Sequence, residues 1–297
     1  MQLNLKPIPR VKAIDKDTFL NEYFFPQQPL VMENLSKDWP ATKKWDFEYF
    51  RSKAGGIVVP LYDGTPARGN EKSHKPARKI KMSGYIDILK AGPTDLRMFF
   101  FNLLQNCPDL LKDFKYPEIG VKFFKKLPVL FVGGEGAKVL MHYDMDLANN
   151  FHFNFAGTKK FILYPPSETK NLYKVPYSIV SMEAIDMDDP DFKIYPALAK
   201  AKGYEVLLKH GDTLFIPSKW WHFVKYETPC LSLTLRSLPT KPAKILEVLK
   251  NVILIRNYDN LMRKIKGQKW IDYKNTRAVE NTHKNAGIDD ERKTSVS

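Results

Sequence analysis

The second part of the chain, from about residue 128, is a series of short apolar segments separated by turn residues. In order, the segments are PVLFVGG, KVLMHYDM, NFHFNFAG, KKFILYPP, YEVLLKHGD, TLFIPSKWWHFVKY and CLSLTLRS. Runs of this length, punctuated by glycine, proline and aspartate, are typical of β-strands. A series of such strands predicts a mainly β fold, an antiparallel barrel or jelly roll with flanking helices.

Two of these segments alternate between apolar and polar side chains, as a strand with two different faces does. One face of NFHFNFAG carries three phenylalanines: Phe151, Phe153 and Phe155. Its other face carries three polar residues: Asn150, His152 and Asn154. In CLSLTLRS the polar face carries Ser232, Thr234 and Arg236. We expect the apolar faces to pack in a core and the polar rows to line the interior of the barrel.

The first part of the chain has a mixed pattern. Residues 15–25, 43–53 and 83–91 read as short helices, residues 95–113 as a longer one, and GGIVVPLYD as a strand. We therefore expect residues 1–120 to form an α/β region packed on a barrel core of residues 121–240.

After Pro242 the apolar residues recur at helical spacing. The apolar stripe consists of Ile245, Val248, Leu249, Val252, Ile255, Met262 and Ile265. The stripe stops at Gly267, a residue that often follows the end of a helix. The pattern predicts a helical segment over residues 241–275 and a polar, frayed tail over residues 276–297.

Composition limits the class of protein. The chain has 297 residues and is 43% hydrophobic, which is enough for one large domain with a substantial core. No apolar run approaches the roughly 20 residues of a membrane helix, and the N-terminus has no apolar segment typical of a secretory signal. Cys107 and Cys230 are too few for a disulfide framework. We expect a cytoplasmic protein.

Charge adds an expectation about partners. Lys and Arg number 47 against 33 Asp and Glu, a formal net charge of +14. The excess favours an acidic partner, either an acidic protein segment or nucleic acid. Residues 68–81 (RGNEKSHKPARKIK) form a basic stretch, expected to be a loop, but no RNA-recognition or helix-turn-helix signature is present. A nucleic-acid-binding module that uses the barrel only as a scaffold stays an alternative.

The segment HYD holds the clearest chemistry. On a strand, His142 and Asp144 point to the same face because they are two residues apart. His222 follows 80 residues later, in another predicted strand. Two histidines and one carboxylate on one face of a metal form the facial triad of non-haem Fe(II) oxygenases, which leaves positions open for an oxo-acid cosubstrate and O2. The HxD pair alone is a weak signal, and the distant histidine strengthens it.

Several segments, in order, resemble one known family. They are IPR, QPLVMENL, WPATKKWDFEYF, HYD, AGTKKFILYPP, IDMDDPDF, GYEVLLKHGDTLFIPSKWWH and LSLTL. Across roughly residues 7–237 the chain resembles the jumonji C (cupin-type) 2-oxoglutarate oxygenases, and most of all the asparaginyl hydroxylase that inhibits hypoxia-inducible factor. The resemblance implies a double-stranded β-helix with Fe(II) on His142, Asp144 and His222. It also implies a C-terminal helical pair that often mediates dimerisation.

The resemblance further implies a site for the cosubstrate. Lys159 matches the family lysine that pairs with the distal carboxylate of 2-oxoglutarate, and Asn150 matches an amide that helps to hold it. Three positions depart from the family pattern. Val139 stands where the relative has a threonine, Phe99 where it has a tyrosine, and Arg236 where it has an asparagine.

Arg236 and His152 carry open alternatives. Arg236 faces the barrel interior, so we expect it to join Lys159 in binding the cosubstrate. The alternative is that it pairs with an internal Asp or Glu and is structural. His152 either donates to a cosubstrate carboxylate or is a hydrogen-bonded barrel residue.

Other polar and aromatic residues near these motifs have simpler interpretations. Asp146 reads as a solvated loop carboxylate and His210 as a surface residue. Trp220 and Trp221 are expected to pack rather than bind, and Tyr143 to belong to the core.

By resemblance, we expect the function to be hydroxylation of an unactivated C–H bond, since no chromatin-reading module accompanies the barrel. The substrate is a protein side chain, an RNA base or a small molecule. A cupin-like metal-binding protein without catalytic activity is the second alternative, because the departures at Val139 and Phe99 remove two cosubstrate contacts.

Overall fold

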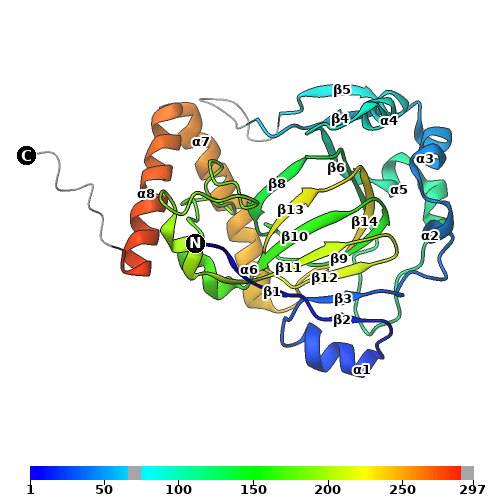
Figure 1. Ribbon diagram of the computed structural model, residues 1–297, viewed down its shortest axis with the longest axis horizontal. Helices are drawn as coiled ribbons and strands as arrows, with labels where there is room; N and C mark the ends of the chain where they lie inside the picture. Colours follow the sequence, from blue (N-terminus) through cyan, green and yellow to red (C-terminus); the bar gives the residue numbers. More distant parts are fainter. Residues whose placement is uncertain (66–74, 289–297) are drawn as a thin grey trace, which may run out of the picture.

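The computed structural model describes residues 1–65 and 75–288 and consists of two β-sheets that face each other, with helices on both sides (Figure 1). The five-stranded sheet has the order β1 (Asn4–Pro7), β11 (Lys202–Leu208), β10 (Lys159–Tyr164), β13 (Trp221–Tyr226) and β8 (Lys138–His142). The seven-stranded sheet has the order β2 (Arg10–Val11), β3 (Leu30–Met32), β12 (Thr213–Ile216), β9 (Asn149–Ala156), β14 (Cys230–Ser237), β7 (Val129–Gly133) and β6 (Arg97–Asn102). This arrangement confirms the predicted mainly β, jelly-roll core.

Helices and a small sheet surround the barrel. The N-terminal elements are α1 (Lys16–Thr18), η1 (Phe19–Phe24), α2 (Pro40–Lys44), α3 (Phe47–Ala54), α4 (Met82–Ala91), α5 (Leu103–Asn106) and η2 (Pro108–Asp113). A two-stranded sheet joins β4 (Val58–Leu61) and β5 (Arg78–Lys81). The segment between β10 and β11 contains the short turns η3 (Pro166–Asn171) and η4 (Pro196–Lys200). The C-terminal elements are α6 (Pro242–Leu249), η5 (Lys250–Ile255), α7 (Arg256–Lys266) and α8 (Gln268–Ala286).

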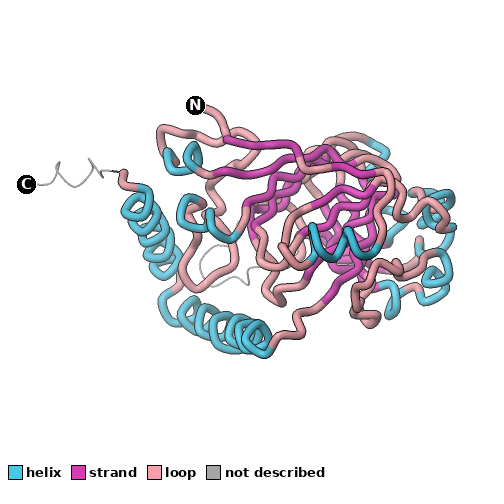
Figure 2. Tube along the Cα trace, turned by 90° about the horizontal axis from the view of Figure 1, so that it is seen from below, coloured by secondary structure: helices cyan, strands magenta, loops and turns pink. Residues whose placement is uncertain are grey.

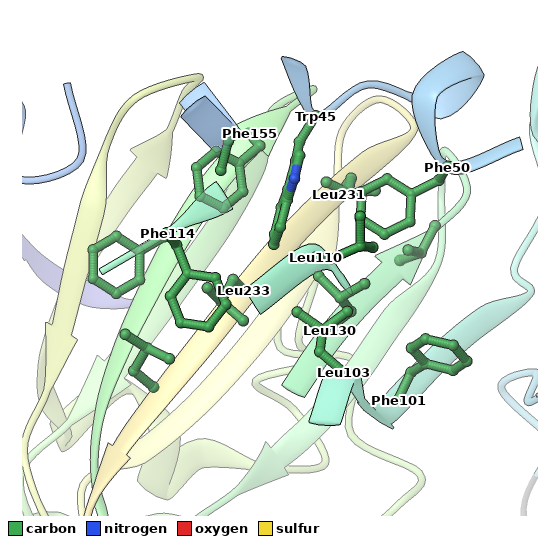
Figure 3. Packing of buried hydrophobic residues seen from close by; sticks show 14 of the residues in the cluster. Trp45, Phe50, Phe101, Leu103, Leu110, Phe114, Leu130, Phe155, Leu231 and Leu233 are labelled. Carbon is green, nitrogen blue, oxygen red and sulfur yellow. The ribbon is translucent and has the colours of Figure 1, made fainter. Parts of the chain in front are cut away.

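The outer face of the seven-stranded sheet packs against the N-terminal helices. Its alternating residues supply Phe151, Phe153, Phe155, Leu231, Leu233 and Leu235. Trp45 and Phe50 from the helices meet Phe155 and Leu231, and Phe101 and Leu103 complete the same cluster (Figure 3). The predicted apolar faces of the two alternating segments therefore form this core.

The outer face of the five-stranded sheet forms a second core. Met141, Ile162, Tyr164, Trp221 and Phe223 pack there against the segment between β10 and β11. The interior of the barrel holds a third, smaller apolar cluster, which includes Phe161, Leu163, Leu214, Val224 and Tyr226. The remaining interior positions, described below, are polar.

Three predicted elements differ from the structure. Residues 97–102 form strand β6 rather than the start of a helix over 95–113, because they pair with β7. TLFIPSKWWHFVKY is two strands in different sheets rather than one, with residues 217–220 as the connection. In the basic stretch, residues 68–74 lie outside the described residues, and Arg78–Lys81 form strand β5 instead of a loop.

The C-terminal helices extend further than the sequence pattern indicates. Helix α8 continues to Ala286. The prediction of a frayed tail is therefore wrong for residues 276–286, which are helical. Part of α8 is buried, including Trp270, Lys274 and Ala278, although its sequence is largely polar. Residues 289–297 of the expected tail lie outside the described residues.

The helix that runs from α6 through α7 lies along the edge of the molecule, with one side facing outward (Figure 2). Its exposed apolar residues are Ile245, Leu246, Leu249, Val252, Ile253, Leu254, Leu261 and Ile265. Within the described residues, no helix is long and apolar enough to cross a membrane.

Phe151 is fully buried and contacts the rings of Phe19, Phe123 and Phe215. We expect Phe151→Ala to lower the free energy of unfolding by about 3–5 kcal/mol, because it leaves a cavity between the sheet and the N-terminal helices. Urea denaturation measures this. Phe25→Ala, at a ring that is 66% exposed, is the control and should change stability by less than about 1 kcal/mol. Equal losses in both variants would contradict this account of the core.

Candidate functional site

Three side chains with metal-binding atoms converge inside the barrel. His142 is the last residue of β8 and is the register partner of His222 on β13. Their ring centroids are 4.1 Å apart. Ligand atoms of His142, Asp144 and His222 all lie within 4.8 Å of one another. The structure thus brings together the three residues that the sequence nominated, in a geometry that could hold one metal ion.

Backbone carbonyls fix the orientation of both imidazole rings. Nδ1 of His142 donates to the carbonyl of Leu140 over 2.7 Å, and Nδ1 of His222 donates to the carbonyl of Trp220 over 3.0 Å. The Nε2 atoms are therefore left as the ligand atoms, which is the usual arrangement of metal-binding histidines. Burial and the neighbouring His222 lower the pKa of His142 to about 4, so its ring is neutral and able to donate a lone pair.

Asp144 reaches the site by a different route from the expected one. Strand β8 ends at His142, and Asp144 lies in a turn closed by the Leu147 amide, which donates to the Asp144 carbonyl over 3.1 Å. Its carboxylate accepts a hydrogen bond from the Asn150 side chain and faces Arg236. Burial opposes ionisation of Asp144, but the charge of Arg236, the neighbouring histidines and the hydrogen bond from Asn150 together outweigh it and hold the pKa of this carboxyl well below its usual range.

Arg236 is buried and has two carboxylate partners. Nη1 donates to Asp146 Oδ2 over 2.6 Å, and Nη2 lies 3.5 Å from Asp144 Oδ1. The expectation that Asp146 is a solvated loop carboxylate is therefore wrong, since the turn after β8 directs it back to Arg236. This pairing matches the structural alternative for Arg236. A contact between Arg236 and a cosubstrate stays a prediction.

Lys159 is a fully buried cation on the inner face of β10. Its Nζ donates to Ser232 Oγ over 2.5 Å, lies 3.3 Å from His152 Nε2, and stands 4.4 Å from the centroid of the Tyr226 ring. Among the described residues, no carboxylate pairs with it. Burial lowers the pKa of this ammonium to about 8. A buried charge of this kind favours an anion beside it.

His152 is neutral in this network. The Lys159 ammonium can only donate to Nε2, so the proton of the ring is on Nδ1, which donates to Thr234 Oγ1 over 2.8 Å. Burial and the charge of Lys159 both lower the pKa of His152 well below its usual value. The arrangement has the form of the hydrogen-bonded barrel histidine, and a direct contact between His152 and a cosubstrate stays a prediction.

Asn150 is hydrogen-bonded to Asp144 rather than to Lys159. Its amide donates to Asp144, while its buried Oδ1 has no hydrogen-bond partner among residues 1–65 and 75–288. The positions of the two other departures from the family pattern are also defined. Val139 packs beside the apolar cluster in the barrel, and the ring of Phe99 lies 4.4 Å from that of Tyr62.

Tyr226 is a site residue that the sequence did not single out. The Lys159 ammonium lies over its ring. The ring also fills the space beside Gly133, where a Cβ atom would lie 2.4 Å from it. The spacing could have indicated it. Tyr226 follows His222 by four residues on the same strand, so both point inward.

Apart from Asp146, the simpler interpretations of the surrounding residues are correct. Trp220 and Trp221 are buried in two different apolar clusters, and Tyr143 packs edge-on against Trp221. His210 is exposed, and its Nδ1 lies 2.6 Å from the carbonyl of Phe155.

Comparison with known proteins agrees with the observed fold. A family profile described as a cupin-like domain matches residues 16–249. Jumonji C domain-containing protein 5 of Drosophila melanogaster is 30% identical over 240 residues, which cover 76% of this chain and 59% of the fly protein.

Two further relatives have names that refer to two different activities. The tRNA wybutosine-synthesizing protein 5 of Gallus gallus is 28% identical over 73% of this chain and 72% of its own length. Lysine-specific demethylase 8 of Xenopus tropicalis is 29% identical over 73% of this chain and 50% of its own length. The chain therefore spans between half and three quarters of these relatives. The specific likeness to the asparaginyl hydroxylase stays a prediction.

The buried lysine makes stability depend on pH. The pKa of Lys159 falls from 10.5 to about 8 on folding, so between these values the unfolded chain binds a proton that the folded chain has released. Stability contributed by this site therefore rises with pH across that window. We expect the difference in unfolding free energy between wild type and Lys159→Met to change by about 3 kcal/mol from pH 7 to pH 10.5, in favour of wild type.

Lys160→Met is the matched control, because Lys160 points to the outer face and pairs with Asp188 over 3.1 Å. Urea denaturation at a series of pH values measures both variants. A difference for Lys159→Met that stays constant with pH would contradict a buried, uncompensated charge.

Proposed function

Since the chain belongs to the cupin-like domain family, we propose that it is an oxygenase that depends on Fe(II) and 2-oxoglutarate, and that it acts as a hydroxylase. The observation that carries this proposal is the convergence of His142, Asp144 and His222 in one barrel whose interior also holds the buried Lys159. Neither feature alone would be enough, because clusters of three such residues also occur without a metal.

The donor set fits iron. Two neutral imidazole nitrogens and one ionised carboxylate are the ligands of the non-haem Fe(II) oxygenases, which bind oxygen and an oxo-acid at the remaining positions. Iron held by His142, Asp144 and His222 would supply the redox chemistry that couples decarboxylation of 2-oxoglutarate to hydroxylation by O2. The protein supplies the orientation of these ligands, through the carbonyls of Leu140 and Trp220 and the side chain of Asn150.

The polar interior fits a dicarboxylate. Lys159 would pair with the distal carboxylate of 2-oxoglutarate, while Ser232 and the neutral His152 hold the ammonium in place. By the resemblance described above, Val139 and Phe99 stand where the relative has a threonine and a tyrosine, so two hydroxyl contacts would be absent. The cation of Lys159 is buried and has no carboxylate partner in the described part of the chain. We infer that its pairing with 2-oxoglutarate supplies most of the binding affinity that the two hydroxyls supply in the relative.

Two substrate classes have support. The name of the chicken relative refers to a modified tRNA base, and the net charge of +14 favours a polyanion. The name of the frog relative refers to demethylation at lysine, which is the same oxidative chemistry on an N-methyl carbon. We favour hydroxylation of an RNA base, with a protein side chain as the second candidate.

Binding of 2-oxoglutarate tests this function directly. Under anaerobic conditions with Fe(II), isothermal titration should show that wild type binds 2-oxoglutarate and that Lys159→Met binds it about 10- to 100-fold more weakly, because a hydrogen bond to a charged group is lost. Lys160→Met should bind like wild type, since its side chain points away from the barrel interior.

Removal of the ligands tests the metal. Succinate formation that requires both Fe(II) and 2-oxoglutarate should occur in wild type and disappear in His142→Ala and Asp144→Ala. A wild-type protein that binds iron and produces no succinate with any peptide or RNA would instead support the alternative of a cupin-like metal-binding protein without catalysis.

The outward face of α6 and α7 supports a homodimer. Exposed apolar residues at this density, such as Leu246 and Leu254, are unfavourable in water and favour burial against a second copy. We expect Leu246→Glu with Leu254→Glu to convert a dimer into a monomer in light scattering. Arg256→Glu, an exposed charge change on the same helix, should leave the dimer intact. A monomeric wild type would contradict the proposal.

A further inference from the structure

Strand β6 contains an irregularity next to the proposed site. Met98 pairs with Val132 and Phe101 pairs with Leu130, so two residues of β6 occupy the place of one. Met98 and Phe101 are three residues apart and would face opposite sides of a regular strand, yet both are buried in the same core. The extra residue of this bulge turns Phe100 away from that core.

Phe100 is held in an uncommon conformation. Its φ of 61° lies in the left-handed region, which aromatic residues rarely adopt. Its ring stands 5.0 Å from Cζ of Arg236 and is 45% exposed. One face of the ring therefore lies on a guanidinium and another part of the ring is open to solvent. Such a conformation costs free energy and persists only where the surrounding structure enforces it, and residues of this kind cluster at functional sites.

The position of Phe100 is close to the proposed metal site. The guanidinium beneath its ring is the one that pairs with Asp144 and Asp146. A flat group stacked on the free face of Phe100 would thus be separated from the metal-ligating carboxylate only by the ring and one arginine. A group stacked there would lie beside the proposed metal site.

A basic and aromatic segment lies beside the ends of β6 and β14, the strands that carry Phe100 and Arg236. The Phe124 amide donates to the carbonyl of Arg236 over 2.7 Å, which fixes the segment VKFFKKLP (residues 121–128) at the same end of β14. Phe124 is 36% exposed, and Lys122, Lys125 and Lys126 are all exposed. Cations interleaved with exposed rings are typical of surfaces that bind single-stranded nucleic acid.

We propose that Phe100 is a substrate-contacting residue that stacks on an unpaired base of a single-stranded RNA at the mouth of the barrel, while Lys122, Lys125 and Lys126 contact the adjacent phosphates. This inference rests on the proposed function and names its substrate surface. The charge of the segment favours RNA over a protein substrate, because three exposed lysines within five residues complement a row of phosphates.

Binding of defined oligonucleotides tests the proposal. The probes are a 12-nucleotide oligo(rA) and a 12-nucleotide strand of the same charge with abasic ribose at every position, measured by fluorescence anisotropy at two salt concentrations. Wild type should bind oligo(rA) about tenfold more tightly than the abasic strand, because each stacked base contributes affinity that phosphates cannot supply.

Variants separate the ring from the charges. Phe100→Gly should lose about tenfold in affinity for oligo(rA) and none for the abasic strand, and it should not lower stability, because glycine adopts the observed φ freely. Phe100→Trp, which keeps a ring, should retain binding of oligo(rA). Lys125→Ala with Lys126→Ala should weaken binding of both strands and reduce their salt dependence.

Tyr273→Ala is the control for an exposed ring elsewhere. Tyr273 is 50% exposed on α8, on the opposite side of the molecule from α3 and α5 (Figure 1), and its loss should change neither affinity. Wild-type affinity for oligo(rA) that is unchanged in Phe100→Gly, or equal to that for the abasic strand, would overturn the proposal. Anaerobic binding of 2-oxoglutarate is measured without RNA, so the proposed function can stand when the RNA surface fails.

Discussion

The pairing of β9 with β14 is the constraint on which the core and the site both depend. In this pair Asn150 lies opposite Arg236, His152 opposite Thr234, and Asn154 opposite Ser232. Side chains of a strand alternate between its faces, so the same register that turns these six residues inward turns the phenylalanines and leucines between them into the outer core. A shift by one residue would place phenylalanines beside His142, Asp144 and His222, and polar groups against the N-terminal helices.

The polar interior has two parts with different charge balance. Beside the metal-ligand set, Arg236 is compensated by Asp144 and Asp146. Deeper on β10, Lys159 has hydroxyl, imidazole and ring neighbours, and no carboxylate among the described residues pairs with it. Burial of an uncompensated ammonium costs free energy, which a bound carboxylate can recover. Val139 and Phe99, which carry no hydroxyl, therefore do not remove the reason for a dicarboxylate to bind.

The sequence predicted the strands of the barrel well and the N-terminal region less well. Strands β9 and β14 alternate strictly, and their inward and outward residues follow directly from that pattern. Residues 97–102 read as helical because the run MFFF has no alternation, and only pairing with β7, some thirty residues later, makes them a strand. The polarity pattern also predicts too early an end for helix α8, because it assigns Lys274 and His283 to solvent although both are buried.

By itself, the sequence determined the fold class, the cluster of His142, Asp144 and His222 and the inward row, because these depend on residue type and on spacing within strands. Tertiary structure alone decided the partners of the charges. Asp146 looked solvated until the turn after β8 brought it to Arg236, which is 90 residues away along the chain. The sequence pattern predicts that Phe100 belongs to a helix, whereas a bulge in strand β6 places its ring on the guanidinium of Arg236. Periodicity describes which face a side chain takes, whereas contacts between distant strands are set by the register and turns of the folded sheet.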